Sequence, residues 1–158
     1  GAAPDVSQAV IEANAGAIEH CFGGDPTAEQ ILERLDAEAG HWLFQQQGGE
    51  EASGWAADTA DAIRKASPLS VKLSLEAIRR HRRGSLKEAF VSEYRVVQRC
   101  MRPQPGSDFC EGIRALLVDK DGAPRWQPSN LEAVTQGQID EFFLPLGPEH
   151  PRGELALW

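Results

Sequence analysis

The chain has 158 residues, enough for one domain and too few for two of ordinary size. Hydrophobic residues make up 41% and charged residues 25% of the sequence, so we expect a packed core rather than a disordered chain. The apolar runs are far shorter than the ~20 residues of a membrane-spanning helix, and we expect no membrane partner. The net charge of -8 disfavours indiscriminate binding to nucleic acids, because like charges repel at long range.

Basic residues are concentrated in one segment of this acidic chain. Residues 66–102 contain nine Lys or Arg against three Glu. The three cysteines, Cys21, Cys100 and Cys110, show no CxxC spacing, which argues against a disulfide framework or a zinc ribbon and favours a reducing compartment. The first ten residues have neither a basic nor an apolar stretch, so we expect that any targeting segment is absent or already removed.

Helix signals dominate the first part of the chain. Apolar residues recur at helical intervals over 6–22, which predicts a first helix. Asp25 and Pro26 are typical of a helix start, and Gly40 is typical of a helix end. Residues 45–54 are polar and glycine-rich, which predicts a loop, and the periodic residues from Trp55 onwards predict another helix.

Two consecutive helices are expected between residues 67 and 101. Ser67 and Pro68 indicate the start of the first, and we expect Gly84 to end it in a left-handed conformation. Ser85 and Glu88 have the spacing of a capping box for the second. The predicted apolar face of the first helix is Val71, Leu75 and Ile78, and that of the second is Leu86, Phe90, Tyr94, Val97 and Met101.

The last third of the chain predicts two further short helices. Asp108 and Glu111 have capping-box spacing, and Thr135 with Gln138 can open a final helix. Between them, a turn and an extended segment can lay Trp126 across a surface. In the first of these helices we expect four apolar residues to face inward, namely Phe109, Ile113, Leu116 and Leu117. No alternating strand pattern is convincing, so we predict an all-α fold of six to seven short helices.

The sequence shows no recognisable catalytic pattern. Cys100 and His81 could act as nucleophile and base only if the fold brings them together, and a free cysteine is more often a small buried residue. We expect no metal and no cofactor, because the sequence lacks a phosphate-binding glycine motif and its histidines are scattered at His20, His41, His81 and His150.

The run RRHRR, residues 79–83, is the densest cluster of charge. Its arginines are Arg79, Arg80, Arg82 and Arg83. Cations in the last turn of a helix offset the negative end of the helix dipole, which is one interpretation. The alternative is that these four side chains contact a phosphate-bearing partner or an acidic protein surface.

Three stretches, SPLSVKLSLEAIRR, EAFVSEYRVVQRCMR and DFCEGIRALLVDKDGAPRWQP, resemble the C-terminal part of the 3-hydroxyisobutyryl-CoA hydrolase family. This family belongs to the crotonase (enoyl-CoA hydratase/isomerase) superfamily, whose wider members share the D-x-x-E-G element. The resemblance implies mitochondrial hydrolysis of a CoA thioester in valine breakdown. It places the catalytic residues in a preceding spiral core, so no catalytic residue is assigned here. It also implies that Lys120 lies near the 3'-phosphate of CoA, whereas the alternative is a solvated turn residue.

The resemblance divides the chain into three expected parts. Residues 1–66 form a helical segment that packs against a missing crotonase core, residues 67–145 form a C-terminal helical domain with the family motifs, and residues 146–158 form an irregular tail. The expected partner is a crotonase-type core polypeptide, encoded by the same gene or supplied as a separate chain, with acyl-CoA at the rim. The chain is expected to be inactive alone. The alternative is a non-catalytic subunit of the small mitochondrial ribosomal subunit that contacts rRNA and ribosomal proteins.

Overall fold

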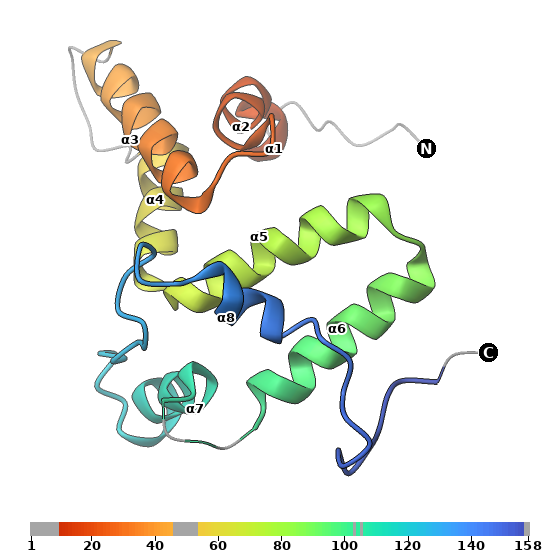
Figure 1. Cartoon of the computed structure of the whole chain (residues 1–158). Coiled ribbons are helices and arrows are strands. Elements are labelled where there is room, and N and C mark those ends of the chain that lie inside the picture. The colour runs from red at the N-terminus through yellow and green to blue at the C-terminus, as the bar shows by residue number, and fades with distance from the viewer. Residues whose placement is uncertain (1–9, 46–53, 103, 105, 157–158) are drawn as a thin grey trace, which may run out of the picture. The chain divides into compact units, whose positions relative to one another are not determined.

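The computed structural model describes residues 10–45, 54–102, 104 and 106–156. Every regular element in these residues is helical, so the predicted all-α class is confirmed (Figure 1). Eight α-helices and one π-helical segment in this part of the chain exceed the predicted six to seven, partly because the predicted first helix is divided at Asn14. The chain forms two compact units, residues 1–65 and residues 66–158.

The first unit contains α1 (Val10–Ala13), α2 (Ala15–Phe22), α3 (Ala28–Gln45) and α4 (Trp55–Lys65). Its core is made mostly of small residues with two larger ones, and the buried hydrophobic residues are Cys21, Ala28, Ile31, Leu35, Ala56 and Ala60. Arg64 of α4 pairs with Asp36 of α3 at 2.6 Å, which ties these two helices at the surface. Most of the predicted loop 45–54 lies outside the described residues.

Two predicted boundaries of α3 are wrong. Thr27, not Asp25, caps the helix, because the Thr27 hydroxyl accepts from the Gln30 amide at 3.2 Å and the Gln30 side chain accepts from the Thr27 amide at 2.9 Å. Asp25 instead has a φ of 61° in the preceding turn. Gly40 lies inside the helix, where a glycine costs about 1 kcal/mol relative to alanine and does not by itself end a long helix.

The second unit contains α5 (Pro68–Arg83), α6 (Leu86–Cys100), α7 (Asp108–Ile113), the π-helical segment η1 (Arg114–Val118) and α8 (Gln136–Glu141). The sequence predicted its helix starts well: Ser67 caps α5, and the capping boxes at Ser85 and Thr135 are both present. The helix α5 ends just before Gly84 as predicted, but this glycine is extended with φ at -108° rather than left-handed.

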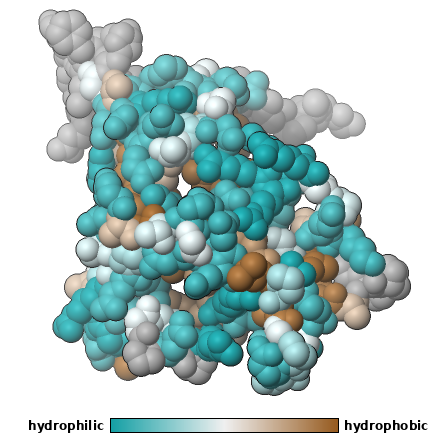
Figure 2. All heavy atoms as spheres, in the orientation of Figure 1, coloured by the Kyte–Doolittle hydropathy of each residue, from teal (hydrophilic) through white to brown (hydrophobic). Residues whose placement is uncertain are grey.

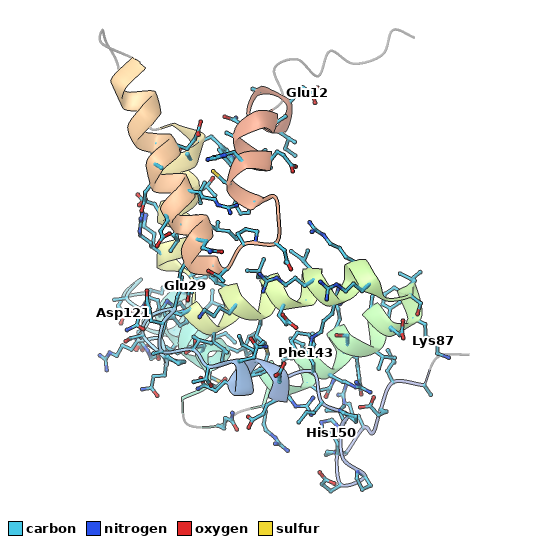
Figure 3. All side chains as sticks on the ribbon, turned by 45° about the horizontal axis from the view of Figure 1, so that its top comes forward. Glu12, Glu29, Lys87, Asp121, Phe143 and His150 are labelled. Atoms are coloured by element: carbon cyan, nitrogen blue, oxygen red, sulfur yellow. The ribbon has the colours of Figure 1, made fainter. Side chains whose placement is uncertain are left out.

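The core of the second unit lies where α8 packs against α5, with α6 residues alongside. Its buried cluster is Leu73, Val134, Ile139 and Phe143, with partly buried Leu69, Ala77, Val96, Cys100 and Phe142 against it. Phe143, labelled in Figure 3, follows the end of α8. The predicted inward face of α5 is wrong at Ile78, which is 53% exposed, because the buried face follows Leu69, Leu73 and Ala77 instead.

Arginines on α6 hold the chain that follows α8. Arg95 donates to the Phe143 carbonyl at 3.1 Å and pairs with Glu154 at 2.7 Å. Arg99 donates to the carbonyls of Phe142 at 3.2 Å and Pro145 at 3.1 Å. Carbonyls near a helix end lack intrahelical partners, so these contacts satisfy them and fix the C-terminal segment on α6.

Candidate docking site on the C-terminal helices

The D-x-x-E-G element ties α7 to an extended segment. Asp108 accepts hydrogen bonds from the Ser67 hydroxyl and from the Gln127 amide, the latter at 2.8 Å. Glu111 accepts from the Arg125 amide at 2.7 Å. The predicted cap by Asp108 is wrong, because Ser107 caps α7 and frees both carboxylates for these contacts.

Gly112, the last residue of this element, gives space to an aromatic ring. The Trp126 ring lies 3.4 Å from the position that a Cβ on Gly112 would occupy, so the indole packs against the bare helix backbone. The prediction that Trp126 lies across a surface agrees with this contact. The element therefore has a structural role, because it positions residues 125–127 against α7.

Arg114 organises the turn after η1. Its guanidinium binds Glu111 through two nitrogens at 2.9 and 2.8 Å, and it also contacts Asp119 at 2.6 Å and Asp121 at 2.7 Å. Asp121 is labelled in Figure 3 on this turn. The Asp119 amide donates to the Arg114 carbonyl at 2.8 Å, the five-residue spacing of a π-helix. Sequence reasoning missed Arg114, although acidic residues three before it and five and seven after it were a usable signal.

These contacts perturb the ionisation of the turn. The hydrogen bonds from Arg114 and from the Arg125 amide lower the pKa of Glu111 from 4.5 to about 2. Hydrogen bonding to Arg114 also lowers the pKa of Asp121, and Glu111 and the two aspartates raise the pKa of Arg114. Glu111, Asp121 and Arg114 therefore stay charged at neutral pH, and their contacts hold the turn together.

The low pKa of Glu111 predicts a pH-dependent contribution to stability. The folded-state pKa lies below the unfolded value, so the contribution is fully present above pH 4.5 and is lost as the pH falls from 4.5 towards about 2. We expect Glu111→Gln to lower the melting temperature at pH 6. Below pH 4.5 the gap, meaning the difference in melting temperature from the unsubstituted chain, should shrink. Thermal melts of both chains across this range measure the gap. Glu132→Gln, at an exposed position, is the control, and a gap that persists unchanged at pH 3 would contradict the assignment.

The predicted inward face of α7 and η1 is instead exposed. The exposed fractions are 45% for Phe109, 38% for Ile113, 71% for Leu116 and 62% for Leu117, and Val118 adds 69%. The inward prediction is wrong for this chain because the internal contact of η1 is made by Ala115, which is 2% exposed. Contiguous exposed apolar side chains are characteristic of an interaction site.

A second exposed apolar stripe runs along α6. Four of the five residues predicted to form one apolar face are largely accessible, at 74% for Leu86, 54% for Phe90, 46% for Val97 and 57% for Met101. Figure 2 shows apolar residues gathered at the lower right of the visible face, where α6, the end of α8 and the segment after it overlap. The helix is amphipathic as predicted, yet its apolar stripe faces solvent in this chain.

Lys120 occupies the exposed tip of the Arg114-bound turn. Its backbone is left-handed with φ at 56°, and Gly122 follows with φ at 61°. The acidic neighbours Asp119 and Asp121 are both engaged by Arg114, which offsets their charge near the Lys120 side chain. The geometry gives Lys120 a fixed backbone position, and its contact with CoA stays a prediction.

The four arginines of the RRHRR run have different environments. Arg80 binds Glu76 at 2.7 Å and Asp140 at 2.6 Å, and it lies 4.0 Å over the Phe143 ring. Arg79 lies 3.9 Å from Glu76. Arg82 and Arg83 are exposed at the end of α5. Arg80 therefore helps to fix α8, and Arg82 with Arg83 is the more accessible pair for a partner.

His81 and Cys100 line the same groove between α5 and α6 but do not form a catalytic pair. The Nδ1 atom of His81 lies 3.9 Å from Glu93, and Cys100 is seven residues further along α6, a helical rise of about 10 Å. Burial also raises the pKa of the Cys100 thiol, which disfavours the nucleophilic thiolate.

Among the described residues, no group of three or more His, Cys, Asp or Glu side chains is arranged to hold a metal ion. Over the same part of the chain, no helix combines the length and apolar character needed to cross a bilayer. The best-defined surface features of the second unit are thus its apolar stripes and the groove of α5 and α6.

Comparison with known proteins identifies the family. A family model described as enoyl-CoA hydratase/isomerase matches residues 2–143. The chain belongs to this family. The fold agrees, because a solved enoyl-CoA hydratase from Rhodobacter sphaeroides superposes with a TM-score of 0.72 and 31% identity over 99% of the chain. The resemblance predicted from the sequence is therefore confirmed.

Curated relatives carry the names that the sequence motifs predicted. The chain is 37% identical over 141 residues to 3-hydroxyisobutyryl-CoA hydrolase-like protein 1, mitochondrial, of Arabidopsis thaliana, covering 89% of this chain and 32% of that protein. It is 39% identical over 128 residues to the small ribosomal subunit protein mS47 of the same plant, covering 81% of this chain and 29% of that protein. It also covers 40% of the solved hydratase. The chain thus spans about a third of the length of the curated relatives it matches.

Proposed function

We propose that this family member is the helical docking part of a mitochondrial 3-hydroxyisobutyryl-CoA hydrolase-like protein. In this proposal a crotonase-type core polypeptide supplies the catalytic groups for thioester hydrolysis, and the chain is inactive without it. The observation that carries the proposal is the exposed apolar face of α7 and η1, formed by Phe109, Ile113, Leu116, Leu117 and Val118. The likeness to a solved enoyl-CoA hydratase, with 31% identity and a TM-score of 0.72, supports a core partner of this kind.

The chemistry of the exposed face suits a folded apolar partner. Complete burial of a leucine or phenylalanine side chain stabilises a structure by ~1.5–3 kcal/mol relative to exposure. The Arg114 network fixes the turn beside this face before any partner arrives, so little additional ordering of that turn is required on binding. In the proposed complex Lys120 lies at the rim of the acyl-CoA site, where its ammonium can meet the 3'-phosphate.

The proposal predicts that a core polypeptide binds this chain and becomes active. The core would be the part of the Arabidopsis hydrolase-like protein that lies outside its matched region. We expect native mass spectrometry to detect a one-to-one complex. We also expect the mixture to hydrolyse 3-hydroxyisobutyryl-CoA, and neither component to do so separately. The double substitution Leu116→Asp with Leu117→Asp should weaken the complex at least about a hundredfold, because each side chain is more than half exposed and would bury a charge.

A matched control lies on another surface of the same unit. Leu144→Asp changes a leucine that is 54% exposed but follows α8, so binding should be unchanged. Failure of the unsubstituted chain to bind the core, or equal binding by the α7–η1 variant, would overturn the proposed function.

A ribosomal role is the second candidate, favoured by the likeness to protein mS47 and by the exposed Arg82 and Arg83. Here the partners would be rRNA and ribosomal proteins, with phosphates contacting the basic end of α5. The same binding experiment separates the two candidates when salt is varied. Attachment through phosphates weakens steeply as ionic strength rises, whereas apolar docking to a core changes little.

A further inference from the structure

A groove runs between α5 and α6 of the second unit, and none of the residues that line its first cavity belongs to the α7–η1 face. Its cavity volume is about 380 Å³. Small residues line the α5 side at one-face helical spacing, namely Ser70, Ser74 and Ala77, with His81 at the far end. Side chains this small allow another backbone to approach α5 closely.

The groove extends along most of α5. A second cavity of about 330 Å³ shares Ser70, Leu73 and Cys100 with the first. It continues past Ser67 and reaches Phe109 at the edge of the α7–η1 face. From Ser67 to His81 the helix rises by about 21 Å, which equals roughly four turns of a second α-helix. Ile78 and Val97 also line the groove, and they are 53% and 46% exposed. A small apolar molecule would cover only part of this length.

Two buried polar atoms at one end of the groove lack hydrogen-bond partners among the described residues. They are Nε2 of His81 and Oγ of Ser92, and both residues line the 380 Å³ cavity. An unpaired buried polar atom destabilises a fold, so its presence in a groove indicates a missing partner group. The missing group must be able to exchange hydrogen bonds with an imidazole nitrogen and a hydroxyl.

We infer that the α5–α6 groove receives a helical segment, about four turns long, of the crotonase-type core polypeptide. An apolar row of that segment packs over Leu73, Ile78 and Val97, and a hydroxyl or amide side chain pairs with His81 Nε2 and Ser92 Oγ. The inference rests on the proposed function. A third helix beside an antiparallel pair is a common packing solution, with axes about 8–10 Å apart. The solved hydratase has the additional chain to supply such a segment, since this chain covers 40% of it.

Two substitutions in the groove test the inference in the same complex. Ser74→Trp fills the groove from an exposed position, so the chain should still fold while the Kd for the core rises at least about tenfold. Ser92→Ala removes an unpaired buried hydroxyl, so it should raise the melting temperature of the free chain yet weaken the complex by about two- to tenfold. A higher melting temperature of the free chain together with a lower affinity for the core distinguishes a binding role of Ser92 from a structural one. Ser129→Trp, at an exposed loop position, is the control.

The outcomes separate this inference from the proposed function. If the unsubstituted chain binds no core, the proposed function fails and the groove inference fails with it. If Ser74→Trp and Ser92→Ala bind the core normally while the Leu116 and Leu117 variant does not, the groove inference is overturned and the proposed function stands. A small molecule found in the groove of the free chain by native mass spectrometry, and retained in the complex, would also overturn it.

Discussion

Phe143→Ala is expected to lower the free energy of unfolding of the second unit by about 3–5 kcal/mol, the usual cost of removing a buried aromatic ring. Phe143 is 5% exposed and belongs to the cluster that joins α8 to α5. The Arg80 guanidinium also lies over this ring, with its central carbon 4.0 Å from the ring centroid, and this cation–π contact would be lost as well. Urea unfolding, followed with hydrogen exchange in α5, α6 and α8, measures the loss.

The neighbouring residue provides the control for this experiment. Leu144→Ala removes a similar amount of apolar side chain at a position that is 54% exposed, so we expect a change within about 0.5 kcal/mol. Equal effects of the two substitutions would show that Phe143 does not hold α8 in place.

Leu35→Ala is expected to destabilise the first unit by about 2–5 kcal/mol. Leu35 is fully buried at 0% exposure and is among the largest fully buried side chains described. Because the chain forms two compact units, hydrogen exchange should accelerate in α2, α3 and α4 far more than in α5 and α6. The exchange rates of amides in both units measure this difference.

An exposed position in the same unit serves as the comparison. Ile11→Ala changes a side chain that is 74% exposed, and it should leave exchange in α3 close to that of the unsubstituted chain. Equal acceleration in both units after Leu35→Ala would mean that the chain unfolds as one cooperative body.

Function in the proposed complex depends on the second unit keeping its shape. Phe143 contributes to the wall of the α5–α6 groove, so a substitution that destabilises the packing of α8 would also disturb the proposed binding of a core helix in this groove. Residues at the α7–η1 face do not belong to the buried cluster, which makes their substitution a cleaner test of binding than substitution of the core.

Local sequence determined where several helices begin and to which family the chain belongs. Ser67 with Pro68, Ser85 with Glu88, and Thr135 with Gln138 each satisfy backbone amides from a few residues away, so their role is encoded in short spacings. The motif stretches around Asp108 were likewise sufficient for the family assignment, which the match over residues 2–143 confirmed. Asp25 with Pro26 predicted the wrong start for α3, whose cap is instead formed by Thr27 with Gln30, a pair that the sequence analysis did not identify.

Only the tertiary structure decided which apolar faces are buried and what the motif carboxylates do. Helical periodicity shows that Leu116 and Leu117 share an apolar stripe, but burial depends on whether another segment covers that stripe, and here they remain exposed. Asp108 and Glu111 were predicted to cap their own helix, yet they bind amides at Gln127 and Arg125. Contacts between residues far apart in the sequence depend on which segments the tertiary fold brings together. The spacing of neighbouring residues does not contain that information.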